Sequence, residues 1–439
     1  MKSMESIRVA EEVASRLKGR VPEYAVLVSA EKSVMLKLAN GEATVTQSWN
    51  GYTVTVYVAD KGRLMVSSVD AKTPGEAVEK TATILGRLRE SPLYAPLPEP
   101  TGSSYEVLDD KIYEAASTGD MSRIVEDLEL DQVGNAAGMV LAAFRERSLV
   151  TSTGAKLEGR VTEFNGYIRV FQGDDASGQW SWVSTAYDPV TAKKAVETAK
   201  RLAEECARLP RRRVEPGEYR VLLSPMVAGN LLESVVRAAT GGSIVFGFSF
   251  ITPDKVGERI ASEKLTIIDA PRSGRLPGYS EFDDEGIATY DKPIIRHGVL
   301  ENILHNSKTA KLLGGKTTGN AGILMPRPFN ILVSPGSLDD NDMLEALGDG
   351  LYATNNWYTR FQNPAEGLFS TVTRDALFIV ENGRPVACSP RVRLTGTLPG
   401  MISAVEDLGK TLWPIKWWEV NVPSLLPHVL VSKIGVTSE

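Results

Sequence analysis

Two segments of the chain carry the same series of turn and helix-start residues at the same spacing. Each begins with Asn-Gly-Tyr, at residues 50–52 and again at 165–167, and each reaches a helix-opening proline 22 residues after the tyrosine, at Pro74 and Pro189. Between these points each copy has two β-rich runs separated by a polar turn. The proline follows a threonine or an aspartate, which can cap a helix. The repetition predicts one strand–strand–helix unit built twice, with its helices on one side of a largely antiparallel sheet.

Turn chemistry predicts where the strands of each copy end. Asn-Gly is a strong hairpin-turn signal, so we expect turns at 50–51 and at 165–166. A second turn is expected in each copy, at 60–62 and at 173–175, where aspartate and glycine interrupt the apolar pattern.

The repeat also predicts the organisation of the first half. A chain of 439 residues exceeds what one hydrophobic core usually supports, so two domains are expected. The repeat units span about 33–90 and 150–208, with a stiff proline-rich connector at 91–100 between them. We therefore place a duplicated α+β domain at residues 1–213.

The second half has a different pattern. After a basic linker at 211–217, short apolar runs are separated by glycine, proline and asparagine, and long helices are scarce. This pattern predicts a mostly β domain, a barrel or a sandwich, over residues 214–439. It carries one buried helix at 225–240, which begins with a serine cap and a proline and ends at a pair of glycines. The whole chain is expected to be an α+β protein.

Composition argues against several classes of protein. The 49 basic and 55 acidic residues give a net charge of −6, which disfavours a dedicated nucleic-acid binder. No stretch is apolar enough for a membrane span, and the first residues lead directly into an amphipathic helix without a signal sequence. The two cysteines, Cys206 and Cys388, are far apart and suggest no disulfide framework. A cytoplasmic protein that binds neither nucleic acid nor membrane is expected.

The three histidines provide no obvious metal site. His297 lies in a predicted turn, and His305 follows the next strand. Their spacing of eight residues matches no compact pair of ligands, and His428 is remote in the sequence.

The buried helix carries two charged residues, Glu233 and Arg237, four positions apart. Such a pair is an ordinary helix-stabilising contact worth about 0.2–0.5 kcal/mol, or else it faces a groove or a subunit contact. The helix resembles that of the TldD/TldE (PmbA) family, whose TldD members carry a His-Glu-x-x-x-His zinc motif there. On that motif Leu232 and Arg237 take the histidine positions, and Glu233 takes the glutamate. Leucine cannot ligate zinc and a guanidinium stays protonated, so the resemblance implies a degenerate metal site.

Other motifs follow in the order typical of this family. They are an acidic turn at 283–286, a Gly-Val-Leu strand at 298–300, Thr-Gly-Asn-Ala at 318–321 and Gly-Leu-Tyr at 350–352. The family's third zinc ligand is a cysteine near the C-terminus, but the matching segment, 416–421, has none. The resemblance covers nearly the whole chain and favours the TldE/PmbA branch, which lacks the zinc-ligand motif.

Three features are open to two interpretations each. The acidic residues Asp283 to Glu285 are expected to be solvated, or else they form a metal or acid–base cluster. Asn320, in a glycine-rich loop, either faces the cleft or serves the turn. Trp413, Trp417 and Trp418 belong either to the core or to a subunit interface.

The resemblance implies a non-catalytic subunit of a TldD-type zinc metallopeptidase complex that acts on unfolded peptides. On this hypothesis the chain holds no catalytic residue, metal or other cofactor, and zinc belongs to a TldD-like partner. Glu233, Arg237 and Asn320 are its candidate cleft-lining residues, and it pairs with a TldD-like subunit or with itself. One alternative is a homo-oligomeric binding or scaffold protein without a peptidase role. Another is a stand-alone hydrolase that uses residues 283–285 with His297.

Overall fold

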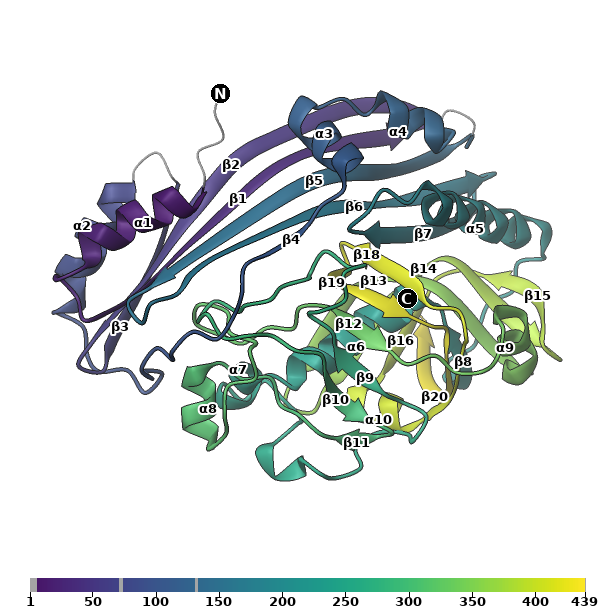
Figure 1. Ribbon diagram of the computed structural model, residues 1–439. Helices are drawn as coiled ribbons and strands as arrows, with labels where there is room; N and C mark the ends of the chain where they lie inside the picture. Colours follow the sequence, from purple (N-terminus) through teal and green to yellow (C-terminus); the bar gives the residue numbers. More distant parts are fainter. Residues whose placement is uncertain (1–5, 71–73, 131–132, 439) are drawn as a thin grey trace.

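The computed structural model describes residues 6–70, 74–130 and 133–438, and within them it has three β-sheets with helices around them. A long curved antiparallel sheet forms the N-terminal part, and a barrel with a neighbouring sheet lies below it in the view of Figure 1. The α+β class, the antiparallel N-terminal sheet and a mostly β C-terminal part with a barrel are therefore confirmed.

Four long strands, β1, β2, β5 and β6, make up the body of the N-terminal sheet. Together with β3 they pair antiparallel in the order β3-β2-β1-β5-β6, while β4 and β7 both pair with β6. The bounds are β1 Glu23–Ala39, β2 Glu42–Asp60, β3 Arg63–Asp70, β4 Tyr105–Val107, β5 Ala136–Thr151, β6 Lys156–Gln172 and β7 Ala176–Ser184. Successive side chains point to opposite faces, so Val26 packs under the helices while Ala25 faces Phe282 of the C-terminal part.

Among the described residues, five α-helices accompany this sheet: α1 Ser6–Leu17, α2 Pro74–Leu85, α3 Asp110–Thr118, α4 Ser122–Asp127 and α5 Pro189–Arg208. Helices α1 and α2 lie together at one end of the sheet and α3 and α4 at the other, while α5 packs on β7 (Figure 1). Asp188 caps α5 by accepting the N–H of Thr191 at 3.0 Å, as the Asp-Pro signal predicts. Thr73, which the sequence suggests as the cap of α2, lies outside the described residues.

The repeat is a unit of three strands and a helix, β1-β2-β3-α2 and β5-β6-β7-α5, which is one strand longer than expected. The turns at 60–62 and 173–175 are confirmed, but the Asn-Gly hairpin turns are wrong, since both pairs lie inside long strands. The hairpin between β1 and β2 turns instead at Asn40 and Gly41, both with positive φ. Gly166 serves packing, because a Cβ there would collide with the ring of Trp182.

The barrel of the C-terminal part closes because β13 pairs with both β8 and β14. Its strands follow the order β13-β8-β20-β16-β14, with β15 and β17 attached to β14 and β20. The bounds are β8 Gly217–Leu223, β13 Gly350–Asn363, β14 Leu368–Glu381, β15 Arg384–Ser389, β16 Val392–Thr397, β17 Val405–Leu408 and β20 Val429–Ser438. The pairing of β8 with β13 is parallel, and the other barrel pairings are antiparallel.

A second C-terminal sheet has the order β11-β10-β9-β12-β19-β18. Its strands are β9 Ile267–Asp269, β10 Lys292–Arg296, β11 Val299–Leu300, β12 Ile331–Val333, β18 Trp413–Trp417 and β19 Val420–Leu426. The helices of this part are α6 Pro225–Ala238, α7 Gly241–Val245, α8 Ser307–Leu313, α9 Asp340–Leu347, α10 Leu398–Ser403 and the short 3₁₀ turn Pro253–Lys255. Helix α6 is the expected buried helix, and it packs on both β13 and β19.

The three C-terminal tryptophans divide between core and surface. Trp413 and Trp417 point inward from β18 and are buried, because alternate residues of a strand share a face. Trp418, in the turn that follows, is 56% exposed. The core interpretation therefore holds for the first two, and Trp418 is available at the surface.

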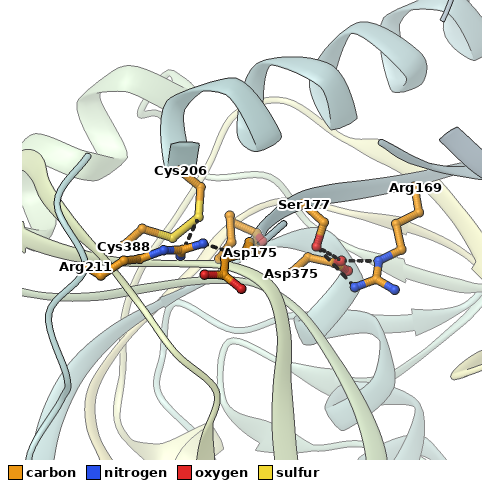
Figure 2. Close-up of a disulfide and its surroundings, with 9 residues drawn as sticks. Arg169, Asp175, Ser177, Cys206, Arg211, Asp375 and Cys388 are labelled. Carbon is orange, nitrogen blue, oxygen red and sulfur yellow. Dashed lines mark hydrogen bonds and ion pairs between the residues drawn. A yellow bond between two sulfur atoms is a disulfide. The ribbon is translucent and has the colours of Figure 1, made fainter. Parts of the chain in front are cut away.

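The cysteines contradict the expectation from sequence. Cys206, near the end of α5, forms a disulfide with Cys388 of β15, with their Cα atoms 5.2 Å apart (Figure 2). Two cysteines 182 positions apart give no local signal of pairing, and only the docking of α5 beside the barrel brings them together. Arg211 lies beside the bond and donates to the Cys206 sulfur at 3.2 Å.

Among the described residues, none of the helices combines the length and the apolar character that crossing a membrane requires.

Candidate functional site

The site suggested by sequence centres on α6, which begins where β8 leaves the barrel. Ser224 accepts the N–H groups of Met226 and Val227 at 3.2 and 3.4 Å, so it caps the helix as expected. Its hydroxyl also donates to the carbonyl of Thr354 at 2.6 Å, which ties the helix start to β13. These bonds fix the direction in which α6 runs and hence the positions of its side chains.

Both carboxylate oxygens of Glu233 are occupied by N–H donors. Arg237 donates to Oε1 from Nε at 2.8 Å and from Nη2 at 2.6 Å. The backbone N–H groups of Asn421 and Val422 donate to Oε2 at 2.8 and 2.9 Å. Glu233 is 4% exposed, so this bonding joins α6 to β19 in a largely desolvated setting.

The residues at the zinc-motif positions do not fit a zinc ion. Leu232 is 1% exposed and packs in the core without a donor atom, and Arg237 brings a positive charge to the second histidine position. The segment 416–421, where the family places a cysteine ligand, does lie against Glu233, but it meets the carboxylate with backbone N–H groups. Within the described part of the chain, no group of three or more His, Cys, Asp or Glu residues is arranged to hold a metal ion.

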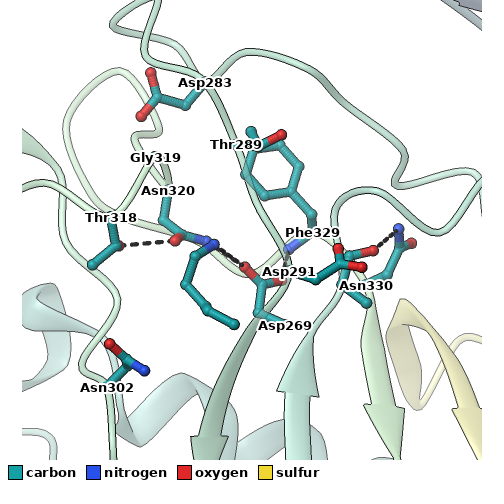
Figure 3. A network of polar contacts seen from close by, with 12 residues as sticks. Asp269, Asp283, Thr289, Asp291, Asn302, Thr318, Gly319, Asn320, Phe329 and Asn330 are labelled. Atoms are coloured by element: carbon teal, nitrogen blue, oxygen red, sulfur yellow. Dashed lines mark hydrogen bonds and ion pairs between the residues drawn. The ribbon is translucent and has the colours of Figure 1, made fainter.

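Asn320 lies in a buried polar network (Figure 3). Its Nδ2 donates to Asp269 at 2.6 Å and to the carbonyl of Arg327 at 3.0 Å, and its Oδ1 accepts from Thr318 at 2.8 Å. Asp269 also accepts the N–H of Phe329 at 2.8 Å and pairs with Lys292 at 3.3 Å. The side chain of Asn320 is fully buried, so it holds loops together and does not line an open surface.

The acidic turn is buried, contrary to the expectation that it would be solvated. Asp283 accepts three backbone N–H groups, two of them from its own turn and one from Ala321. Burial, with repulsion from Glu285, raises the pKa of Asp283 to about 7, although these hydrogen bonds oppose the shift. Glu285 accepts from the backbone and hydroxyl of Ser307 at 2.9 and 2.7 Å and from Lys308 at 2.7 Å. Both carboxyl groups therefore anchor loops.

The histidines are dispersed. His297 is exposed in a turn and has a φ of 47°. His305 is buried, and its Nδ1 lies 3.1 Å from the hydroxyl oxygen of Thr309. Nε2 of His428 lies 3.0 Å from the hydroxyl oxygen of Tyr352. Among the described residues, no hydrogen bond or ion pair joins His297 to the acidic turn, since His297 bonds instead to Arg259 and Thr266. The structure therefore does not bring residues 283–285 and His297 together as the hydrolase interpretation requires.

A pocket of about 670 Å³ lies between the long sheet and the C-terminal loops, and of the candidate residues suggested by sequence it is lined by Asp284. Its lining includes Glu31, Arg145, Arg147, Asp284 and Arg327. Arg147 donates to Asp284, and its guanidinium lies 4.8 Å from the centre of the Phe282 ring. Arg145 and Arg147 are two positions apart on β5 and so share a face, which is the sequence signal that could have revealed this wall.

A second pocket, of about 410 Å³, lies where β6 of the long sheet meets the turn between β18 and β19. Tyr167, Trp418 and Asn421 are among its lining residues. Since the N–H of Asn421 bonds to Glu233, this pocket adjoins the degenerate motif on α6. The sequence indicated the tryptophan group but not its position beside α6.

Comparisons with known proteins agree with this fold. Residues 216–438 match the model of the PmbA/TldA metallopeptidase C-terminal domain. The chain is 25% identical over 283 residues to a metalloprotease of Methanocaldococcus jannaschii, which is 61% of this chain and 60% of that protein. It is 28% identical over 237 residues to the metalloprotease PmbA of Escherichia coli O157:H7, which is 52% of this chain and 50% of that protein. The matched region thus spans less than two thirds of either relative.

Two solved structures share the fold over essentially their whole length. TldE from Thermococcus kodakarensis superposes with a TM-score of 0.83 at 18% identity, covering 98% of this chain and 100% of that one. A protein from Bacteroides thetaiotaomicron described as a putative modulator of DNA gyrase superposes with a TM-score of 0.82 at 18% identity, covering 100% of both chains. Together with the matched C-terminal domain, which is more than half of the chain, these findings show that the chain belongs to the TldD/TldE (PmbA) family.

Proposed function

We propose that this chain is a non-catalytic subunit of a TldD-type zinc metallopeptidase complex that acts on unfolded peptides. The observation that carries the proposal is the bonding of Glu233. A glutamate that serves as general base in a metallopeptidase must be free to take a proton from a metal-activated water. Here Arg237 and two backbone N–H groups occupy both of its oxygens, so its role is to fasten α6 to β19.

The proposal assigns zinc and hydrolysis to a TldD-like partner with a complete His-Glu-x-x-x-His motif. This chain contributes part of the chamber wall, and an extended peptide is held there by main-chain hydrogen bonds. Residues 1–213 and 214–439 act as its two domains, and the complex works in the cytoplasm. The proposal of a role in a peptidase complex is supported by family membership and by relatives that are named metalloproteases.

Reconstitution with a TldD-like chain from the same source tests the proposal. Zinc content and hydrolysis of unstructured casein are measured for this chain, for the partner and for the mixture. We expect no zinc and no hydrolysis with this chain alone, and more hydrolysis in the mixture than with the partner alone. Stoichiometric zinc together with hydrolysis by this chain alone would overturn the proposal.

A second candidate function is a homo-oligomeric binding or scaffold protein without a peptidase role. It is favoured by the exposed aromatic residues Phe246 and Phe248, which are 50% and 61% exposed in the segment after α7 and suit contact with another chain. Native mass measurement separates the two candidates. A stable self-dimer that does not associate with a TldD-like chain would favour the scaffold.

A further inference from the structure

Arginine and aromatic side chains form a continuous surface at the edge of the barrel. We call it the arginine–aromatic surface, and it consists of Trp357, Tyr358, Arg360, Arg374, Arg391 and Trp418. These residues come from β13, from β14, from the connection between β15 and β16, and from the turn between β18 and β19. Segments far apart in the sequence therefore build one surface, and β13, β14 and β18 lie under the long sheet in Figure 1.

The guanidinium groups alternate with the rings. Arg374 lies 5.1 Å from the centre of the Trp357 ring and 5.4 Å from that of Trp418, so it sits between two indoles. Arg391 is 5.5 Å from the Trp357 ring. Arg360 is 4.1 Å from the Tyr358 ring. Stacking on aromatic faces holds an arginine in a fixed position while leaving the outer N–H groups available to a ligand.

Among the described residues, the arginines of this surface form no ion pair with a carboxylate, although Asp375 and Glu419 lie nearby. Within the described part of the chain, Arg360, Arg374 and Arg391 have no acidic oxygen within 4.0 Å. Nη1 of Arg374 and Nε1 of Trp357 are also buried without an acceptor among those residues. Burial lowers the pKa of Arg374, and repulsion from Arg169 and Arg391 acts in the same direction, against the nearby Asp375. Arg374 and Arg391 are thus close enough to repel each other, and Arg360 stacks on Tyr358, whose ring lies 6.2 Å from that of Trp357. An anion at the exposed Arg360 and Arg391 would complement this arrangement.

The backbone holds part of this surface in a strained conformation. Tyr358 has a φ of 60°, which is rare for an aromatic residue, and its N–H donates to Glu419 at 3.0 Å. The pairing of β13 with β14 shifts register between Trp357 and Arg360. A bulge of this kind redirects side chains, and here it leaves Tyr358 54% exposed.

The 410 Å³ pocket continues the surface toward the long sheet. Trp418 belongs to both, and its ring lies 6.1 Å from that of Tyr167 inside the pocket. Met35 and Met139 give the pocket an apolar wall, and Lys37 adds an exposed cation at its rim. A ligand that carries both negative charge and apolar side chains fits this combination.

We propose that the arginine–aromatic surface binds an acidic segment of an unfolded polypeptide. Glutamate and aspartate carboxylates pair with Arg360, Arg374 and Arg391, and neighbouring apolar side chains enter the pocket beside Trp418. A peptide fits better than a nucleic acid, because its apolar side chains can pack against Met35 and Met139 in the pocket. The inference deepens the proposed function by naming a class of substrate, and it rests on that function.

Binding by the chain alone tests the inference without a peptidase partner. The probes are a short fluorescent peptide rich in glutamate and tyrosine, the same peptide with glutamine in place of glutamate, and a short single-stranded oligonucleotide. Arg360→Gln and Arg391→Gln change exposed side chains and leave the fold intact, and Arg384→Gln, at an exposed arginine of β15, is the matched control. Fluorescence anisotropy measures each dissociation constant.

We expect the glutamate peptide to bind more tightly than the glutamine peptide and to lose affinity as salt is added. Each surface variant should weaken that binding about threefold and the double variant about tenfold, while Arg384→Gln has no effect. Equal affinity for both peptides, or unchanged binding in the double variant, would overturn the inference. Tighter binding of the oligonucleotide would also overturn it and assign the surface to nucleic acid. If casein hydrolysis is reconstituted while peptide binding fails, the inference alone is wrong and the proposed function stands.

Discussion

Asp375 of β14 accepts a hydrogen bond from Nε of Arg169 in β6 at 2.5 Å, and this ion pair joins the barrel to the long sheet (Figure 2). The carboxylate also accepts from the hydroxyl of Ser177 and from the amide of Asn355, both at 2.7 Å. The Asp375 side chain is fully buried, and its φ is 61°. Aspartate and asparagine tolerate this left-handed conformation better than other residues with side chains, so this position combines a backbone requirement with a charge requirement.

Asp375→Asn should separate those two requirements. Asparagine keeps the left-handed backbone but removes the carboxylate that pairs with Arg169. The Arg169 side chain is only 20% exposed, so its charge would be left largely desolvated. We expect a loss of about 3 kcal/mol in the free energy of unfolding, measured by urea denaturation. Asp174→Asn, at an exposed turn residue, is the control and should change stability by less than about 0.5 kcal/mol. Equal small effects would mean that the ion pair contributes nothing to stability.

Loss of the Cys206–Cys388 disulfide should destabilise the protein without changing its fold. The bond closes a long loop between α5 and β15. The free energy of unfolding should therefore fall by about 2–4 kcal/mol in the chain with serine at both positions. Reductant should lower the melting temperature of the natural chain and leave that of the double serine variant unchanged. Two free thiols in a thiol assay of the freshly purified, unfolded chain would contradict the bond.

Glu233→Gln should affect stability and not hydrolysis in the reconstituted complex. Glutamine loses the charge that pairs with Arg237, and it cannot accept at both ends as the carboxylate does. A cost of about 1–3 kcal/mol in the free energy of unfolding is expected. Casein hydrolysis by the mixture, assayed well below the melting temperature, should stay within twofold of that with the natural chain. Loss of hydrolysis in a folded variant would give Glu233 a direct role in the reaction.

Asn320→Ala tests whether this residue belongs to the core network or to a binding surface. Alanine removes the donor to Asp269 and leaves a buried carboxylate with fewer partners. This change should lower the free energy of unfolding by about 1–3 kcal/mol. Affinity for the glutamate peptide should not change. Asn341→Ala, at an exposed position of α9, serves as control for the loss of an amide group. Weaker peptide binding with unchanged stability would restore the cleft-lining interpretation.

Stability should depend on pH through His305. Burial lowers the pKa of His305 below its ordinary value of 6.5. Just below pH 6.5 the unfolded chain therefore binds more protons than the folded one at this position, so stability falls as the pH drops through that window and is recovered above it. His305→Gln should remove this part of the pH dependence. His297→Asn, at an exposed turn histidine, should keep it, and denaturant titrations between pH 5 and pH 8 compare the three proteins.

Local signals in the sequence were reliable where neighbours in the chain decide the structure. The Asp-Pro and Ser-Pro pairs start α5 and α6 where expected, because a cap bonds to N–H groups two or three residues away. The polar turns at 60–62 and 173–175 end strands for the same local reason. The Asn-Gly pairs at 50–51 and 165–166 did not form turns, because continuous pairing along a long strand outweighs the preference of two residues for a turn.

By itself, the sequence determined the α+β class, the duplicated strands and helix, the buried α6 and the loss of zinc-ligand side chains at Leu232 and Arg237. Only the tertiary structure decided what Glu233 does, since its partners Asn421 and Val422 lie almost 190 positions away. The packing of distant segments likewise decided that the acidic turn is buried and that the disulfide forms. The physical reason is that caps and turns form between near neighbours, whereas desolvation and pairing depend on which surfaces come together.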